Sequence, residues 1–453
     1  MSPANPQLTA RIPQEIHDEI IGSFHHDHHA LRTCALVCRA WLPRARHYLF
    51  RKVTLDPSPR SCNFVKLAQK CPDIQPLVRD LELRGRAATS KAWWEGAQTT
   101  DIPWPLLPTL PGNVPHPATL RREPDAVEVL SWMRLTFAPA HGGRPALLSL
   151  PNVHTLRLFE TTLSTESAAF FWEVFPGVHT LSVNQCRVMS FAGLTALLQA
   201  FPRLRNLRLL AVEWLPQRPG GALPDTTRGS LANLATLHIS RDICMEPLMD
   251  WLSKVAAHET IRRLSCSIAT RLNATAVRTF LKASGSSLDH LSITLVESHD
   301  PTGMFRLFRP PSYKVLTGVL APLVGSSAIL EATQLDLSTC TGLRSLSIPC
   351  SRSRAEPSSS SLSWVLILLS KVRSPYLGEI RISMTSAELD RLNLEGLDVV
   401  LARNALSSLQ SLVFDIDDMK ATSKFGGAGL GALLRQRVPT ASRKGLVRLE
   451  YRR

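Results

Sequence analysis

A short pattern of apolar positions recurs along most of the chain. It consists of an apolar residue, two variable residues, a leucine, one variable residue and a second apolar residue. Six consecutive copies begin at Val153, Val178, Leu204, Leu234, Ile261 and Leu288. The five intervals between these starts are 25, 26, 30, 27 and 27 residues, which average 27. The alternation of apolar and variable positions predicts one short strand in each copy, with one face buried.

Amphipathic, helix-like segments lie between the predicted strands, at Ser167–Phe175, Phe191–Phe201 and Ala274–Leu281. A strand, a turn and a helix in every ~20–29 residues is the plan of a leucine-rich repeat. The pattern recurs less regularly from Leu343, Leu377, Leu409 and Leu446, and upstream from Phe50 and Val78. A generic α/β domain would show no fixed period. The sequence therefore predicts an α/β chain whose repeats stack into a leucine-rich-repeat-like solenoid with one continuous core.

The first fifty residues have a different, helical pattern. Three short helices are predicted, defined by Ile16, Ile20 and Phe24 for the first, Leu31, Cys34 and Trp41 for the second, and Pro43, Ala45 and Tyr48 for the third. The stretch His25–His29 is predicted to be a polar connection between the first two helices. So small a unit buries little apolar surface within itself, and its exposed apolar positions suggest a surface for a partner.

The order of residues in this module resembles an F-box. The resemblance rests on Ile12-Pro13-Gln14-Glu15-Ile16, on Ile20-Ile21, on Leu31 and on Leu36-Val37-Cys38-Arg39-Ala40-Trp41. Together with the repeats, the chain resembles a fungal-type F-box protein with an irregular leucine-rich-repeat-like C-terminal region. This resemblance implies docking on the Skp-family linker subunit of a cullin–RING ubiquitin ligase, and through it on the cullin. The contact positions it implies are Ile12, Pro13, Ile16, Ile20, Leu31, Leu36, Val37, Cys38 and Trp41. The alternative is a self-contained helical cap on the repeats.

These patterns divide the chain into an N-terminal tail (1–11), a three-helix F-box-like module (12–50) and a repeat region (51–453). Three segments interrupt the repeats, one of which is the basic stretch Arg306–Lys314 between the copies that begin at Leu288 and Leu343. Residues 101–124 contain seven prolines, which predict an extended or disordered insertion, and residues 351–363 contain seven serines, which predict a flexible loop.

Composition restricts the class of protein and of partner. Of the 453 residues, 44% are hydrophobic and 20% are charged, which excludes a largely disordered or membrane-embedded chain. No secretory signal and no apolar run of ~20 residues is present, so the expected location is cytoplasmic, nuclear or both, with no membrane partner. The nine scattered cysteines are expected to be reduced. The net charge of +15 includes +6 within residues 435–453, and no aromatic residues interleave a basic stripe, which favours acidic protein partners over nucleic acid.

The sequence contains no catalytic constellation and no cofactor motif. The run Gly426–Gly431 lacks the spacing of a nucleotide-binding loop. Adjacent histidines in His25–His29 can bind zinc adventitiously, but no cysteine or carboxylate set completes a tetrahedral site, so a solvated loop is the preferred interpretation. We therefore expect a non-catalytic subunit, with no metal and no cofactor.

Substrate selection would fall to the repeats. The variable residue between the last two apolar positions of each copy is expected to lie on the exposed concave face. This row contains Arg157, Ser182, Arg208, His238, Ser265, Ser292 and Ser347. Arg157, Arg208 and His238 suit an acidic or phosphorylated protein substrate. Two functions remain open: an adaptor of an SCF-type ubiquitin ligase, and a repeat scaffold for protein or nucleic acid without coupling to a ligase.

Overall fold

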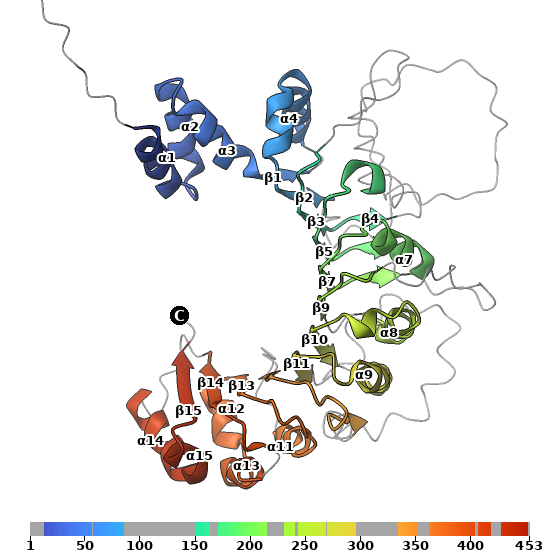
Figure 1. Cartoon of the computed structure of the whole chain (residues 1–453), viewed down its shortest axis with the longest axis vertical. Coiled ribbons are helices and arrows are strands. Elements are labelled where there is room, and N and C mark those ends of the chain that lie inside the picture. Colours follow the sequence, from blue (N-terminus) through green and yellow to red (C-terminus); the bar gives the residue numbers. More distant parts are fainter. Residues whose placement is uncertain are drawn as a thin grey trace, which may run out of the picture.

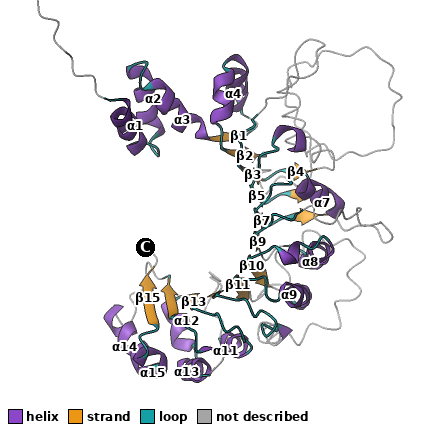
Figure 2. Ribbon diagram, viewed as in Figure 1, coloured by secondary structure: helices purple, strands orange, loops and turns teal. Residues whose placement is uncertain are grey.

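The computed structural model describes residues 13–56, 58–85, 150–163, 171–214, 231–240, 243–268, 270–295, 334–350, 362–403, 406–417 and 427–451. These residues form an arc in which strands line the inner side and helices lie on the outer side (Figures 1 and 2). The expected tail 1–11, the proline-rich segment 101–124 and nearly all of the serine-rich segment 351–363 lie outside the described residues, as does Ile12.

The chain is α/β, with a large parallel sheet. The strands of this sheet are β1 (Lys52–Leu55), β2 (Asp80–Arg84), β3 (Thr155–Phe159), β5 (Thr180–Asn184), β7 (Asn206–Leu210), β9 (Thr236–Ile239), β10 (Arg263–Ile268), β11 (His290–Leu295), β12 (Ser345–Pro349), β13 (Glu379–Met384), β14 (Ser411–Ile416) and β15 (Val447–Tyr451). Within the described residues these twelve strands are hydrogen-bonded in chain order, and every pair is parallel. Each of the twelve copies of the apolar pattern holds one of them.

The register of the sheet follows the repeated pattern. Leu156 pairs with Leu181, and Leu181 pairs with Leu207. The same alignment connects the equivalent residue of every strand from β1 to β14. Only β15 departs from it, because Leu412 pairs with Val447 and not with Leu449. A shift of two residues keeps the same side chains on the same face, so β15 remains compatible with the core.

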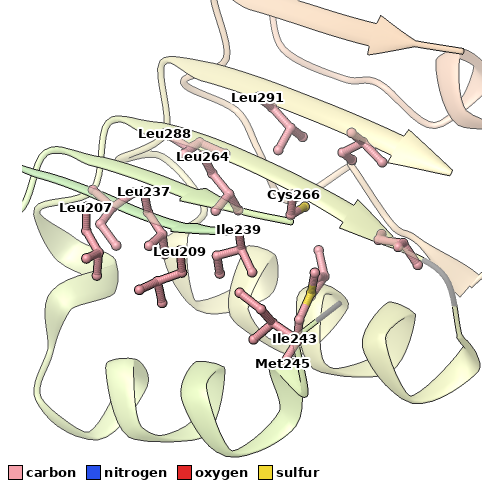
Figure 3. Close-up of a cluster of buried hydrophobic side chains, with 14 of the residues drawn as sticks. Leu207, Leu209, Leu237, Ile239, Ile243, Met245, Leu264, Cys266, Leu288 and Leu291 are labelled. Atoms are coloured by element: carbon pink, nitrogen blue, oxygen red, sulfur yellow. The ribbon is translucent and has the colours of Figure 1, made fainter. Parts of the chain in front are cut away.

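Helices cover the outer face of this sheet. They are α4 (Pro59–Lys70), α7 (Phe191–Gln199), α8 (Met245–Lys254), α9 (Arg271–Ser284), α11 (Ser363–Ser370), α12 (Ser386–Arg391), α13 (Leu394–Leu401), α14 (Gly427–Arg437) and α15 (Pro439–Arg443), with 3₁₀ turns η1 (Pro72–Leu77) and η2 (Ala257–Glu259). Side chains of β7 and β9 point towards this layer, and Ile243 and Met245 meet them at the start of α8 (Figure 3). One cluster of buried residues extends from Val53 to Ala441.

Three consecutive strands are followed by a residue in the left-handed region. These residues are Glu160, Gln185 and Ala211, with φ of 51°, 52° and 50°. Each turns the chain out of the large sheet and into a second parallel sheet of two-residue strands, namely β4 (Thr162–Leu163), β6 (Arg187–Val188) and β8 (Glu213–Trp214). The equivalent conformation in three copies shows that the repeat extends beyond the strands.

The N-terminal module consists of α1 (Gln14–Ser23), α2 (His28–Val37) and α3 (Leu42–Arg51), and it lies at one end of the arc (Figure 1). Its core is separate from that of the sheet and contains Ile21, Leu31, Cys34 and Ala45. The helix α3 ends at Arg51 and β1 begins at the next residue, so the module continues directly into the sheet. Among the described helices, none combines the length and the apolar character that a bilayer crossing requires.

The buried leucine of β10 gives a direct test of this architecture. Leu264 is 2% exposed, and we expect Leu264→Ala to lower the free energy of unfolding by about 2–5 kcal/mol because it leaves a cavity between stacked strands. The neighbouring Ser265 points to the inner face, and Ser265→Ala is expected to change stability by less than ~0.5 kcal/mol. Urea denaturation followed by circular dichroism measures both, and equal effects of the two substitutions would contradict the observed orientation of β10.

Candidate functional site

Five large apolar side chains are exposed on the N-terminal module. This apolar patch consists of Ile16 and Ile20 on α1, Phe24 directly after α1, and Leu36 and Val37 at the end of α2. Leu36 is 86% exposed and Val37 is 58% exposed, which are high values for aliphatic side chains on a folded helix. The four-residue spacing of the α1 members places them on a single helix face.

Local contacts set the two ends of α2, whose last two residues, Leu36 and Val37, belong to the apolar patch. The Asp27 carboxylate accepts hydrogen bonds from the backbone N–H groups of His29 and Ala30, so α2 begins at His28, inside the segment that the sequence predicted to be a connection. These two hydrogen bonds lower the pKa of Asp27, the one to Ala30 more strongly. The helix then ends at Val37, because Cys38 is extended with φ of −159°.

The two parts of the apolar patch are linked at the start of α1. The Gln14 side chain donates a hydrogen bond to the carbonyl of Ala40, at 3.2 Å. The rings of His17 and Trp41 lie 5.8 Å apart between centroids. The beginning of α1 therefore lies beside the loop that follows Leu36 and Val37.

The expected linker-contact positions differ in their surroundings. Pro13 and Cys38 are exposed, like the members of the apolar patch, and Trp41 is half-buried against the core of the module. Leu31 is fully buried, so its expected role as a contact residue is wrong: it packs against Ile21 and the rest of that core and has no surface to offer a partner. A helix pattern alone does not tell a core position from a docking position, because both are apolar.

The second candidate surface is the inner face of the large sheet. The expected row of Arg157, Ser182, Arg208, His238, Ser265, Ser292 and Ser347 forms one continuous line, because each residue pairs in register with the next. Every member is exposed or half-buried. Neighbouring members are about 4.8 Å apart, which is the spacing of hydrogen-bonded strands.

The three basic members of this row have different environments. Arg157 lies 4.0 Å from the carboxylate of Glu82 on β2, and this partner offsets part of its charge. Arg208 forms no ion pair with any described residue, and it pairs in register with His238. Burial and then the nearby charge of Arg208 lower the pKa of His238, so this histidine is neutral near pH 7. The strongest free positive charge of the row therefore lies at Arg208.

A shallow hollow of about 470 Å³ lies farther along the inner face, over β9 to β13. Besides serines of the row, its lining contains Arg263, His290 and Glu379. These three residues do not belong to the predicted row, which contains only the position between the two buried side chains of each strand. The position just before the first buried side chain points to the same face, since side chains alternate along a strand, and this rule could have identified them.

The described residues contain no group of histidine, cysteine or acidic side chains that could hold a metal ion. The histidines of the segment 25–29 are exposed, and the rings of His25 and His26 lie 3.7 Å apart between centroids. Free thiols are found at Cys34, Cys38, Cys71, Cys186, Cys244, Cys266, Cys340 and Cys350. Burial raises the pKa of Cys266 to about 12, so this thiol is protonated and unreactive near neutral pH.

Four half-buried histidines predict how stability depends on pH. Burial is the largest cause that lowers the pKa of His47, His179, His238 and His290. A lowered pKa in the folded state means that the unfolded chain binds protons first as the pH falls. The contribution of these histidines to the free energy of unfolding is therefore fully present above the ordinary histidine pKa of 6.5, and it decreases as the pH falls below that value. We expect a lower urea midpoint at about pH 5.5 than at pH 7.5.

Substitution of a single histidine measures its share of this pH dependence of stability. His238→Gln should reduce this difference between the two midpoints, whereas His26→Gln, at an exposed position, should leave it unchanged. Equal midpoints at the two pH values for the unsubstituted chain would contradict the prediction.

Comparison with known proteins does not assign the chain to a family. No protein-family model matches the chain, and no curated protein matches it. Its function is therefore argued from two surfaces: the apolar patch on α1 and α2, and the polar inner face of the sheet.

Proposed function

We propose that this chain is a non-catalytic substrate-recognition adaptor of a cullin–RING ubiquitin ligase. In this proposal the N-terminal module docks on the Skp-family linker subunit, which connects it to the cullin. The repeat region is a leucine-rich-repeat-like solenoid whose inner face holds a protein substrate.

The observation that carries the proposal is the exposure of Leu36 and Val37. Among its described residues, the module fully buries four in its core and exposes five large apolar side chains. Exposed apolar clusters of this kind mark interaction sites, because leaving them in water costs about 25 cal/mol per Å² of apolar surface. The resemblance to an F-box gives the partner, and the patch includes four of the positions that the resemblance implies: Ile16, Ile20, Leu36 and Val37.

The repeat assignment is supported by the register of the sheet. Stacked copies of one strand–helix unit, each bonded to the next in chain order, are what a solenoid requires. Such an array has an extended concave surface, and it commonly uses this surface for binding. The inner face here is polar and partly basic, which suits an acidic or phosphorylated protein segment.

Substitution at the most exposed leucine tests the docking proposal. We expect Leu36→Asp in the full chain to weaken binding to a purified Skp-family linker subunit by about tenfold or more, because a carboxylate would be buried in an apolar contact. Leu272 is 66% exposed on α9, far from the module, and Leu272→Asp is the matched control with the same change of charge. Surface plasmon resonance or a quantitative pull-down measures both variants.

Two outcomes contradict the proposal. Failure of the unsubstituted chain to bind the linker subunit would leave the module as a cap on a repeat scaffold. Equal binding by Leu36→Asp and the unsubstituted chain would show that the linker is held elsewhere.

A further inference from the structure

A line of basic residues follows the edge of the sheet at which the first strands begin. This basic rim consists of Arg51, Arg79, His154, His179 and Arg205. From Arg79 onwards, the backbone N–H of each rim residue donates a hydrogen bond to the carbonyl of the preceding rim residue, at distances of 2.8–2.9 Å. The five residues therefore occupy equivalent positions on five neighbouring strands, even though 154 sequence positions separate the first from the last.

The side chains of the rim also meet. The Arg79 guanidinium lies 2.9 Å from Nε2 of His154, and because arginine can only donate, it is the donor in this contact. The rings of His154 and His179 lie 5.3 Å apart between centroids. Burial, followed by His154, Arg205 and Arg203, lowers the pKa of His179. The rim is thus a line of basic side chains in which Arg51, Arg79 and Arg205 carry the positive charge near neutral pH.

The cluster continues onto the N-terminal module. Burial is the largest cause that lowers the pKa of His47 on α3, and the charges of Arg44, Arg51 and Arg79 follow. Basic side chains of the module and of the repeats therefore act on one another across the junction between α3 and β1 (Figure 1).

No acidic side chain within the described ranges forms an ion pair with the rim. Farther along the same edge the pattern changes, because Asp289 occupies the equivalent position on β11 and lies 3.8 Å from Arg344. Between the rim and Asp289, Ala235 interrupts the line of basic residues, and Arg262 at the next position donates a hydrogen bond to the carbonyl of Ser287. The first five positions are therefore the longest uninterrupted run of basic residues along the described edge. Like charges held together without a counter-charge repel, and an anionic ligand would relieve that repulsion.

We propose that the basic rim binds an extended, anionic segment of polypeptide, whose charge comes from carboxylate or phosphate groups. Five positions at the strand spacing span about 19 Å, which equals about six residues of an extended chain. Arginine binds carboxylates and phosphates through paired hydrogen bonds, and Arg51, Arg79 and Arg205 provide three such groups along the line. None of the five rim residues is a phenylalanine, tyrosine or tryptophan, the large rings on which successive bases stack, so the geometry favours a peptide over a single-stranded nucleic acid.

This site rests on the proposed substrate-binding role of the repeats, but it is distinct from the row of Arg157, Arg208 and His238 on the inner face. It lies at the strand starts, beside the module that carries the apolar patch. A substrate segment held here would be positioned close to the ligase.

The test uses the full chain and two fluorescently labelled peptides, an oligoglutamate and a serine-rich peptide carrying several phosphates. Fluorescence anisotropy at about 50 mM salt, where the Debye length is ~14 Å, measures their binding. We expect Arg79→Glu combined with Arg205→Glu to weaken binding of at least one peptide by about tenfold or more. The relative affinities of the two peptides distinguish carboxylate from phosphate as the source of the charge.

A matched control separates the rim from the overall charge of the chain. Arg271→Glu combined with Arg403→Glu makes the same change of net charge at exposed positions elsewhere, and it should weaken binding less than about threefold. Circular dichroism checks that both double variants are folded, and Arg79→Gln combined with Arg205→Gln is the milder variant if charge reversal unfolds the chain.

Three results would overturn the inference: no binding of either peptide, equal losses in the two double variants, or stronger binding of a single-stranded oligonucleotide of equal charge. Failure here is distinguishable from failure of the adaptor proposal. Leu36→Asp should bind the peptides normally, and the rim variants should bind the linker subunit normally.

Discussion

A strand and a helix from one repeat cannot cover their own apolar side chains, and this constraint determines the rest of the structure. Each buried leucine must be covered by the equivalent leucine of the next strand, as Leu181 is by Leu156 and Leu207. In-register stacking then fixes the order of the strands and the face to which each side chain points. It also aligns residues far apart in sequence, so that both the polar row and the basic rim are consequences of packing in the core.

The features that depend on this constraint could be predicted from the sequence. Twelve copies of the apolar pattern correspond to twelve strands, and the residues between the buried positions form the expected row. Features that depend on particular long-range or capping contacts could not be predicted. They include the Asp27 cap that starts α2 early, the two-residue shift of β15, and the ion pair that joins Arg157 to Glu82 across 75 sequence positions. Leu31 was misassigned because core and docking positions share an apolar pattern.

The two candidate surfaces differ in the interaction they can make. Burying the apolar patch against a partner is favourable because it removes apolar surface from water. The patch therefore suits one partner surface of complementary shape. The inner face and the basic rim depend on charge and hydrogen bonds, which give specificity and fast association more than affinity. Because α3 ends where β1 begins, both kinds of surface belong to one continuous framework. The proposed docking function at one end and the proposed recognition function along the sheet are compatible with this division.

Hydrogen–deuterium exchange of the full chain, with and without a purified Skp-family linker subunit, tests the central claim most directly. The account predicts slower exchange in peptides from residues 13–38, which carry the apolar patch, and unchanged exchange in peptides from the strands β3 to β14. Unchanged exchange throughout the N-terminal module, or slower exchange confined to the sheet, would contradict it.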